Sequence, residues 1–350
     1  MKILHSIGSF VNGGVETLLI NVVNRQVAEG NSVAIMIVTS KWSQEMIDAL
    51  DSRVKVFYIN KPIGSQNPFY LLKMIYYYKR FKANILHLHS PGSEKLFIPK
   101  NRNERRIVTI HNETIEIPFS STVDQYIAIS QCVLDSFKKK TGHNNCVICY
   151  NGIDINKFKL KDSYSEKPYK ILALGRVLFR VKAQDLIVEA ISKLPADILK
   201  EIHLDIWGSG EDIEQLDLLI KKMHIEKNVT LCGNVTNKFV AENLCKYDLL
   251  FCASHHEGLG ITAIEGMVAG VPLLLSDALG YLEVTENGEY GIHFKHSDSE
   301  AMKDAIIDAY NNYESLCKTA VQSVRYAKNK FSIDSYINKI TEIYNNSIHI

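Results

Sequence analysis

The 350-residue sequence lacks several features that would place it in a familiar class of proteins. It has no run of apolar residues long enough to span a bilayer. Its first ten residues, MKILHSIGSF, have neither the apolar length nor the cleavage site of a secretory signal. Its seven cysteines are odd in number and have no framework spacing, which favours reduced thiols over a disulfide scaffold. We therefore expect a cytoplasmic protein without a membrane span.

Two further absences restrict the chemistry. The chain contains no Asp-x-Asp motif, which fits an enzyme that works without a divalent metal. Its one Cys-x-x-Cys pair, Cys146 and Cys149, lies in a short apolar run that ends at an Asn-Gly turn. No second pair follows it, so we interpret these cysteines as structural. No metal and no other cofactor is expected.

The composition indicates a two-domain chain with unevenly distributed charge. With 46% hydrophobic and 23% charged residues, a chain of this length can bury two cores. The net charge is +1, but residues 1–165 carry 21 Lys and Arg against 13 Asp and Glu, and residues 166–350 carry 19 against 26. The halves therefore have net charges of +8 and −7. This asymmetry suggests that only the first half faces a polyanion or an anionic membrane surface.

Short apolar runs alternate with longer segments of helical periodicity, the pattern of parallel sheets with crossover helices. The expected strands are 2–8, 32–39, 54–59, 84–90, 105–111, 125–130, 146–152, 169–175, 202–208, 229–235, 247–254 and 271–277. The expected helices are 15–30, 68–81, 130–142, 183–195, 211–225, 239–247 and 261–270. We predict an α/β protein with two doubly wound domains that face each other across a cleft, residues 1–160 and 169–330, joined by a polar linker at 161–168. In such sheets, ligands bind at the carboxyl ends of the strands.

The segment SHHEGLGITAIEGMVAGVP, residues 254–272, holds two carboxylates at such a place. We expect Glu257 on the loop that leaves a buried strand and Glu265 on the helix that begins near Ile261. Gly258 and Gly260 allow a ligand to approach the backbone, and their amides with the helix N-terminus favour an anion. Carboxylates accept hydrogen bonds from sugar hydroxyls, so the pattern fits a nucleotide sugar. The alternative is that Glu257 is a solvated loop residue and that Glu265 faces water on an amphipathic helix.

A pair of cations follows the strand expected at 169–175. Arg176 comes directly after Gly175, and Lys182 lies six residues further on, just before a helix. Together they can neutralise a diphosphate and stabilise it as it leaves. We expect Arg180, between them, to be a solvated loop residue. The alternative for the pair is a basic surface loop without a ligand.

Together these segments resemble the retaining glycosyltransferases of family 4, which have the GT-B fold. The strongest resemblance lies in GRVLFRVK and in the E-x7-E pair of HEGLGITAIEGMVAGVP. Weaker elements are NGGVET, VTIHNE, YNGIDINKF and VTLCGNV, in the family's order along nearly the whole chain. The GGVET and EGLGI details are most similar to bacterial capsule, exopolysaccharide and O-antigen enzymes.

The resemblance implies an activity and a set of roles. The protein would be a retaining hexosyltransferase that moves a sugar from a nucleotide diphosphate sugar, UDP by the family's majority, to a glycan or polyprenyl-linked acceptor in bacterial surface polysaccharide synthesis, such as capsule or lipopolysaccharide. Arg176 and Lys182 would hold the diphosphate, and Glu265 the ribose hydroxyls. Glu257 would hold the transferred sugar together with the backbone amides of Gly258, Leu259, Gly260 and Ile261.

The resemblance also gives roles outside these motifs. Val235 would lie near the base, and Gly13 and Gly14 would form an N-terminal loop beside the donor phosphate and the acceptor. His111 would approach the sugar, although Asn112 stands where the family often has Asp, and His111 could instead be a structural residue. Residues 331–350 would form the helix that crosses back to the first domain. Since no residue declares itself a covalent nucleophile, we favour front-face substitution, in which the leaving phosphate accepts the acceptor's proton.

Aromatic and basic residues gather in the segment from 68 to 84 and just after it. They are Phe69, Tyr76, Tyr77 and Tyr78 with Lys73, Lys79, Arg80 and Lys82, followed by Arg102, Arg105 and Arg106. This mixture suits a peripheral helix at the anionic inner face of the cell membrane, where a lipid-linked acceptor would be found. The alternative is that Leu71, Leu72 and Ile75 are the core face of a crossover helix. No nucleic-acid partner is expected, and Lys138 to Lys140 are expected only to end a helix.

Three other functions are compatible with a doubly wound sheet. A nicotinamide dehydrogenase is disfavoured, because IWGSGED supplies only G-x-G without a third glycine. A nonhydrolysing UDP-sugar epimerase shares the GT-B architecture and would isomerise the donor without an acceptor. A catalytically silent nucleotide-sugar-binding protein is the third, and the complete set of cationic and acidic residues argues against it.

Overall fold

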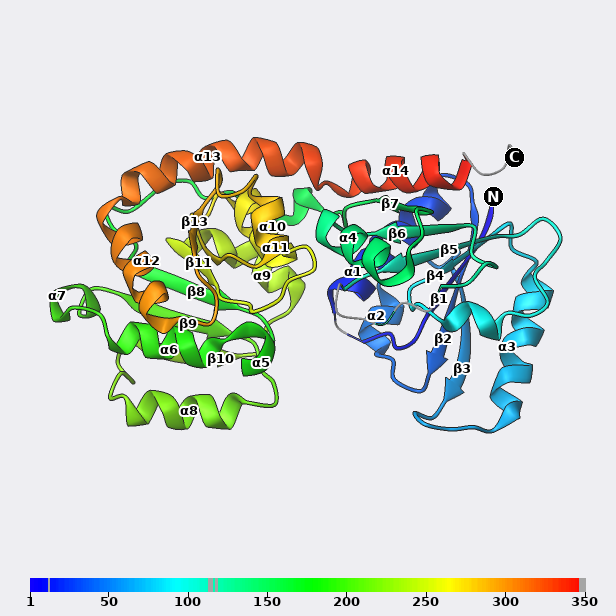
Figure 1. Cartoon of the computed structure of the whole chain (residues 1–350), viewed down its shortest axis with the longest axis horizontal. Coiled ribbons are helices and arrows are strands. Elements are labelled where there is room, and N and C mark those ends of the chain that lie inside the picture. Colours follow the sequence, from blue (N-terminus) through cyan, green and yellow to red (C-terminus); the bar gives the residue numbers. More distant parts are fainter. Residues whose placement is uncertain (12, 113–115, 117–118, 346–350) are drawn as a thin grey trace. The chain divides into compact units, whose positions relative to one another are not determined.

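The computed structural model describes residues 1–11, 13–112, 116, 119 to 345 of the chain. Its contacts divide the chain into two units, Met1–Gly152 together with the segment from Ile333, and Ile153–Ser332 (Figure 1). Each unit is built around one parallel sheet. We describe them one after the other.

The N-terminal unit contains a seven-stranded sheet in the order β3-β2-β1-β4-β5-β6-β7. Its strands are β1 (Lys2–Ile7), β2 (Ser32–Thr39), β3 (Lys55–Lys61), β4 (Ile85–Leu88), β5 (Arg105–Ile110), β6 (Gln125–Ala128) and β7 (Cys146–Ile148). Its first helices are α1 (Gly14–Ala28), α2 (Gln44–Asp48), α3 (Pro68–Phe81) and α4 (Gln131–Thr141), with a 3-10 turn η1 (Ser93–Leu96). The central strands are buried on both faces, so their sequences are continuous apolar runs.

The last helix, α14 (Ile333–Asn345), completes the core of this N-terminal unit (Figure 1). Tyr336, Ile337 and Ile340 are buried there. They share a hydrophobic cluster with Ile3 of β1 and Leu18 of α1. The amphipathic period of α14 therefore buries its apolar stripe against the first strand and helix of the chain.

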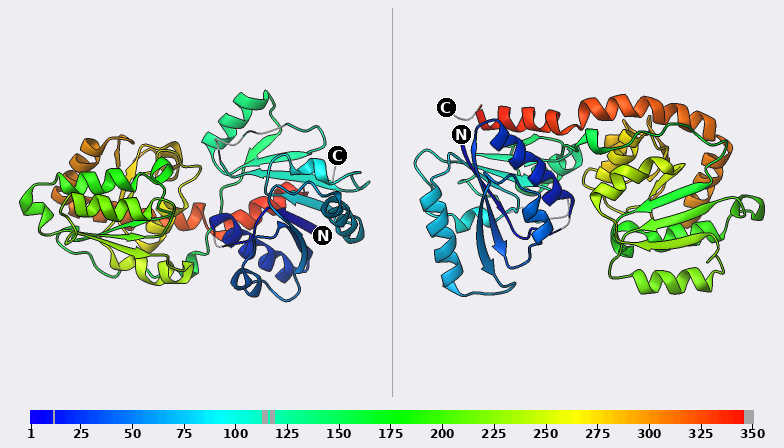
Figure 2. Two further views of the ribbon diagram at one scale, coloured as in Figure 1. Left: turned by 90° about the horizontal axis from the view of Figure 1, so that it is seen from below. Right: turned by 180° about the vertical axis from the view of Figure 1, so that it is seen from behind.

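The second unit contains a six-stranded sheet in the order β10-β9-β8-β11-β12-β13, with helices on both faces (Figure 2). Its strands are β8 (Lys170–Leu174), β9 (His203–Trp207), β10 (Val229–Gly233), β11 (Leu249–Cys252), β12 (Leu273–Ser276) and β13 (Ile292–Phe294). Its helices are α5 (Phe179–Lys182), α6 (Gln184–Ser192), α7 (Ala196–Leu199), α8 (Ile213–Lys222), α9 (Asn237–Asn243), α10 (Ile261–Ala269), α11 (Leu279–Val284), α12 (Ser299–Asn311) and α13 (Tyr313–Lys330), with 3-10 turns η2 (Ile155–Lys157) and η3 (Leu244–Lys246).

All strand pairs of both sheets are parallel, and the strand order reverses once in each sheet. The reversal lies between β1 and β4 in the first sheet and between β8 and β11 in the second. Such a switch point opens a crevice beyond the carboxyl ends of the two strands, where ligands bind in open α/β sheets. The predicted pair of doubly wound domains is confirmed.

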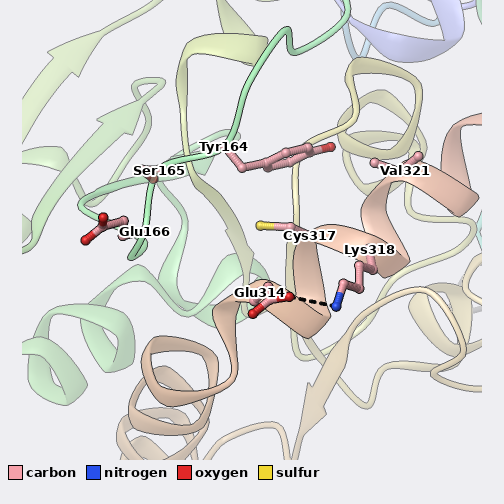
Figure 3. A pocket seen from close by; sticks show the side chains of 7 residues that line it. All are labelled: Tyr164, Ser165, Glu166, Glu314, Cys317, Lys318 and Val321. Atoms are coloured by element: carbon pink, nitrogen blue, oxygen red, sulfur yellow. Dashed lines mark hydrogen bonds and ion pairs between the residues drawn. The ribbon is translucent and has the colours of Figure 1, made fainter.

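The polar segment expected as a linker is attached to the second unit. The Lys161 ammonium donates a hydrogen bond of 2.7 Å to the Tyr247 carbonyl and forms an ion pair with Asp248. The Tyr164 hydroxyl donates to the Gly270 carbonyl. Figure 3 shows a pocket of about 500 Å³ between this segment and α13. Its lining residues are Tyr164, Ser165, Glu166, Glu314, Cys317, Lys318 and Val321.

Helix α3 has the predicted bounds but a different buried face. The buried residues are Met74, Tyr78 and Phe81, at helical spacing. The alternative to the membrane surface, that Leu71, Leu72 and Ile75 form the core face, is wrong for Leu71 and Leu72, which are 36% and 64% exposed, whereas Ile75 is partly buried. The segment carries more apolar residues than one stripe can bury, so its periodicity fits several faces.

Two of the predicted surface arginines are structural. Arg106 is buried and forms an ion pair with Glu104 at 2.9 Å. Arg105 is half-buried and donates to the Ile343 carbonyl of α14. The buried Tyr78 hydroxyl receives a hydrogen bond from Arg106. These three residues are therefore removed from the predicted aromatic and basic surface, whereas Lys138 to Lys140 end α4 as expected.

Candidate functional site

The candidate site lies at the switch point of the second sheet, where the segment after β8 meets the loop after β11. The Lys182 ammonium lies 2.7 Å from Glu257 Oε2, so these two segments are joined by an ion pair. Lys182 is the last residue of α5, and Glu257 lies on the loop between β11 and α10, as predicted. Both side chains are largely covered, with 25% and 19% of their surface exposed. An ion pair in such surroundings is screened less than one in open water.

A tyrosine that sequence reasoning missed completes the environment of Glu257. The Tyr281 hydroxyl donates to Glu257 Oε2 at 3.2 Å and lies 2.9 Å from Ser254 Oγ. Burial opposes ionisation of Glu257, but the Lys182 charge and these hydrogen bonds outweigh it, so the pKa of Glu257 lies below its ordinary value. The carboxylate is therefore ionised at neutral pH and held in one orientation.

Two glycines allow the Glu257 loop to pack against α11. Gly260 has a φ of +81°, and a Cβ there would lie 2.6 Å from the Tyr281 ring. At Gly280 a Cβ would lie 2.4 Å from the Glu257 carbonyl oxygen. Close approach of two backbones is the general use of glycine at such points. Of the other loop residues, Gly258 and Ile261 are partly exposed, and Leu259 is buried.

Glu265 lies on the second turn of α10, as predicted, but it does not face open water. The residue is partly exposed while its carboxylate is buried, and no described residue forms a hydrogen bond or an ion pair with it. Burial raises its pKa to about 7. The buried Cys252 thiol senses the charges of Lys182, Glu257 and Glu265, so the three groups share one neighbourhood. A carboxylate whose pKa is strongly raised by burial is a candidate for a functional residue.

The Arg176 side chain is exposed, and within the described residues it has no ion pair. Its backbone is fixed by the buried Gln184, which accepts a hydrogen bond from the Leu178 amide and donates one to the Arg176 carbonyl. Arg180 is exposed as predicted, but it lies in the short helix α5, not in a loop. The loop that leads to Lys182 thus carries a cation with an anchored backbone and, among the described residues, no ion pair.

The G-x-G of IWGSGED has a packing role. A Cβ at Gly208 would lie 1.9 Å from the Gly175 carbonyl oxygen, and one at Gly210 would lie 2.0 Å from the Val177 carbonyl oxygen. The two glycines let the loop after β9 contact the loop that carries Arg176. This contact explains the motif without a dinucleotide fingerprint.

The other predicted donor-side residues lie at the ends of their elements. Val235 is half-buried between β10 and α9. Gly13 has extended backbone and precedes α1, which begins at Gly14. Val235 and Gly13 lie outside the helices and strands, whereas Gly14, expected on the same loop as Gly13, is the first residue of α1.

His111 follows β5 in the N-terminal unit and ends a chain of histidines in which His5 is buried and His89 and His111 are partly buried. Its Nε2 lies 3.4 Å from His89 Nδ1, and His89 Nε2 lies 3.2 Å from His5 Nδ1. Burial lowers the pKa of His111 to about 4. His5 and His89 were missed, although the signal was in the sequence. KILHSIG, NILHLHS and RRIVTIH each place a histidine near the end of an apolar strand.

Comparisons with known proteins match this geometry to a family. Residues 154–330 match the family described as glycosyl transferases group 1, and residues 12–157 match glycosyltransferase family 4. The chain belongs to the family of glycosyl transferases group 1. The E-x7-E pair and the Arg176 to Lys182 segment lie in the first of these two regions.

Two individual relatives of the chain come from bacterial polysaccharide regions or enzymes. The chain is 35% identical over 169 residues to the O-antigen biosynthesis glycosyltransferase WbnH of Escherichia coli, which covers 48% of this chain and 44% of that protein. It is 25% identical to an uncharacterized 41.2 kDa protein in the cps region of Klebsiella pneumoniae, over 98% of this chain and 99% of that protein. The chain therefore spans less than half of WbnH.

A solved structure shows the fold of the chain. The crystal structure of Anabaena Alr3699/HepE in complex with UDP and glucose matches with a TM-score of 0.78 and 19% identity, over 99% of this chain and 100% of that chain. At this identity the similarity shows the fold alone. The predicted GT-B fold, with two Rossmann-like units, is confirmed.

Proposed function

We propose that this protein transfers a hexose-type sugar from a nucleotide diphosphate sugar to a glycan or polyprenyl-linked acceptor, with retention at the anomeric carbon. The observation that carries the proposal is the Lys182–Glu257 ion pair with Glu265 in the same neighbourhood at one switch point; Arg176 lies on the loop between β8 and α5 that leads to Lys182. UDP is the nucleotide we favour, since the similar structure of Alr3699/HepE contains it. A role in surface polysaccharide synthesis agrees with the O-antigen and cps-region relatives.

Each side chain supplies a distinct interaction in this proposal. Arg176 and Lys182 bind the diphosphate, and the N-terminus of α10 adds its amides to that anion. The Glu265 carboxylate accepts hydrogen bonds from the ribose hydroxyls. Glu257 orients the transferred sugar, and Lys182 exchanges part of its contact with Glu257 for the phosphate when the donor binds.

The reaction we propose needs no covalent enzyme intermediate. The bond between the anomeric carbon and the phosphate oxygen breaks, and the nucleotide diphosphate leaves with the electron pair. The acceptor hydroxyl attacks the same face of the sugar and gives its proton to the leaving phosphate. Arg176 and Lys182 stabilise the charge that develops on that phosphate, which is where electrostatic catalysis has its largest effect. With two cations in this position, we propose that turnover does not require a divalent metal.

The test is a transfer assay with UDP-hexoses and lipid-linked sugar acceptors in EDTA, with Lys182→Ala as the variant. Arg180→Ala is the matched control, because Arg180 is an exposed cation two residues away in the same helix. We expect Lys182→Ala to lower turnover by at least 100-fold, the usual effect of losing one transition-state charge contact, and Arg180→Ala to retain activity. Interconversion of the UDP-sugar without acceptor would instead identify an epimerase.

We also propose that α3 binds an anionic membrane surface. Phe69, Leu72 and Tyr76 are 61%, 64% and 54% exposed and fall on one helical stripe. Arg80 extends this stripe, and its guanidinium donates to the Tyr76 hydroxyl. Apolar and aromatic residues beside basic ones are typical of helices that lie in the membrane interface. None of the helices in the described part of the chain is long and apolar enough to cross a membrane.

Vesicle co-sedimentation tests this surface. We expect the double variant Phe69→Ser/Leu72→Ser to lose binding to vesicles that contain phosphatidylglycerol. The control is Leu218→Ser, because Leu218 is 66% exposed on α8 of the other unit. Equal binding of the double variant and the wild type would contradict the proposed role of α3.

A further inference from the structure

The N-terminal unit contains a continuous hydrogen-bonded chain that no proposed function has yet used. It runs from Gln26 of α1 through His5 of β1 and His89, just after β4, to His111 after β5. Gln26 Oε1 lies 2.9 Å from His5 Nε2, and the two contacts between histidines follow at 3.2 and 3.4 Å. The planes of the His5 and His89 rings differ by 24° and those of His89 and His111 by 20°, with ring centroids 5.5 and 5.6 Å apart, so the rings are nearly coplanar and meet edge to edge through their nitrogens. The chain lies at the switch point of the first sheet.

The geometry favours a hydrogen-bonded chain over a metal site. The ring nitrogens of His5, His87 and His89 lie close enough together for a metal. However, the His87 and His89 rings stack at 28° and 4.5 Å, which keeps their in-plane lone pairs roughly parallel instead of convergent. His87 also contacts Tyr344 and Thr109 through its two ring nitrogens. Both nitrogens of His5 are already used in the chain.

The chain determines which nitrogen of each ring carries the proton. A neutral imidazole has one N–H donor and one acceptor nitrogen. The Gln26 amide is oriented with Oε1 toward His5 Nε2, and its buried Nε2 has no partner among the described residues. In this orientation the oxygen can only accept, so His5 carries its proton on Nε2 and accepts at Nδ1. His89 must then donate from Nε2 and accept at Nδ1, and His111 must donate from Nε2. Burial lowers the pKa of His5 and His111 to about 4, so the rings are neutral at pH 7.

We propose that Gln26, His5 and His89 are positioning residues that fix His111 in its Nε2–H tautomer. His111 Nδ1 is then left with a lone pair that can accept a hydrogen bond from a ligand hydroxyl. This atom is buried and has no hydrogen-bond partner among the described residues. A buried acceptor without a partner is unfavourable unless a ligand satisfies it. The identity of that ligand rests on the proposed function, whereas the tautomer does not.

Nitrogen-15 NMR of the histidine-labelled full chain tests the tautomer directly. We expect the His111 signals, assigned by their loss in His111→Gln, to show a protonated Nε2 and an unprotonated Nδ1 at pH 7. In Gln26→Met the obligatory acceptor is lost, so the His111 Nδ1 resonance should shift toward the protonated position. The control is His87→Asn, which leaves the chain intact and should leave His111 unchanged.

Two results would overturn the proposal. One is a wild-type His111 with its proton on Nδ1, which would mean that the Gln26 amide and every bond of the chain are reversed. The other is a His111 tautomer that does not respond to Gln26→Met in a variant with a cooperative thermal transition. If Gln26→Met fails to fold, the wild-type tautomer decides alone. These readings require no activity, so failure of the proposed transfer reaction would be recognised separately.

Discussion

Glu265 shows how one residue can be unfavourable for folding and useful for binding. Its carboxylate lies on α10 with no partner among the described residues, and burial raises its pKa to about 7. Removing a carboxylate from water disfavours the charged form. Ribose hydroxyls would restore the hydrogen bonds that the folded protein does not provide.

Replacement of this carboxylate should increase stability in a pH-dependent way. The pKa of Glu265 is higher in the folded chain than its ordinary value, so the group favours folding at low pH and loses that contribution as the pH rises through 7. We therefore expect Glu265→Gln to raise the free energy of unfolding by about 1–3 kcal/mol at pH 8 and to change it little at pH 4.5. Urea unfolding at the two pH values measures this. If the gain in stability of Glu265→Gln over the wild type is no larger at pH 8 than at pH 4.5, the burial argument is contradicted. The exposed Glu214→Gln is the control.

Tyr281 allows stability and activity to be separated. In Tyr281→Phe the Glu257 carboxylate and the Ser254 hydroxyl lose one partner, which should lower stability by about 1–2 kcal/mol and reduce sugar transfer. Tyr247→Phe is a matched control, since its hydroxyl contacts Asp205 at 2.6 Å in the same unit and outside the site. We expect Tyr281→Phe and Tyr247→Phe to lose similar stability, and only Tyr281→Phe to lose activity. Full activity of Tyr281→Phe would show that Glu257 needs no such support.

The sequence predicts the positions of site residues whose motif lies within one loop and the helix that follows it. Glu257 and Glu265 are separated by a short segment, and local patterns place both. Tyr281 and Gln184 could not be predicted in the same way, because their partners come from contacts that only the folded sheet creates. The histidines lie between these two cases. The strand segments KILHSIG, NILHLHS and RRIVTIH each contain histidine in the sequence, but only the parallel register of β1 and β4 brings His5 beside His87.

At the scale of elements, the loop after β9 is fixed by glycines. A Cβ at Gly210 would lie 2.0 Å from the Val177 oxygen and 2.9 Å from the Val177 nitrogen, so the Arg176 loop would have to move. We expect Gly210→Ala to lower the free energy of unfolding by about 2 kcal/mol or more, the range of overpacking, and to weaken nucleotide binding. Gly233→Ala is the control, because it has a φ of +71° but open space around it. Thermal unfolding of the two variants measures this difference. Equal losses of stability in Gly210→Ala and Gly233→Ala would contradict the proposed loop contact.

Sequence periodicity predicts the bounds of helix α3 but not its buried face. Its bounds follow from Pro68 at the first helical position and from the left-handed Lys82 that ends it. Its buried face does not follow, because apolar and aromatic residues occur around most of the helix. Only contact with Phe57 of β3 and Phe97 after η1 decides which rings are covered. The stripe left exposed is the surface we propose for the membrane.

At the scale of the whole molecule, four neutral histidines make the N-terminal unit sensitive to acid. Burial lowers the pKa of His5, His87, His89 and His111 below the ordinary value of 6.5. The unfolded chain therefore binds more protons than the folded chain below about pH 6.5, and stability falls as the pH falls toward 4. We expect the thermal transition to move to lower temperature between pH 7 and pH 5, and this loss to be smaller in His111→Gln. Replacement of the exposed His203 by Gln should not alter the loss. A transition temperature that does not change between pH 7 and pH 5 would mean that these rings are not kept neutral by burial.

The measurement that tests the central claim most directly is calorimetric binding of UDP, GDP and ADP to the purified chain in EDTA. The wild type and Arg176→Ala are compared, with Arg180→Ala as the control. We predict micromolar binding of one nucleotide, which Arg176→Ala reduces at least tenfold, about 1.4 kcal/mol, and which Arg180→Ala preserves. No binding of any nucleotide, or binding only when a divalent metal is added, would contradict the diphosphate site at the switch point of the second sheet.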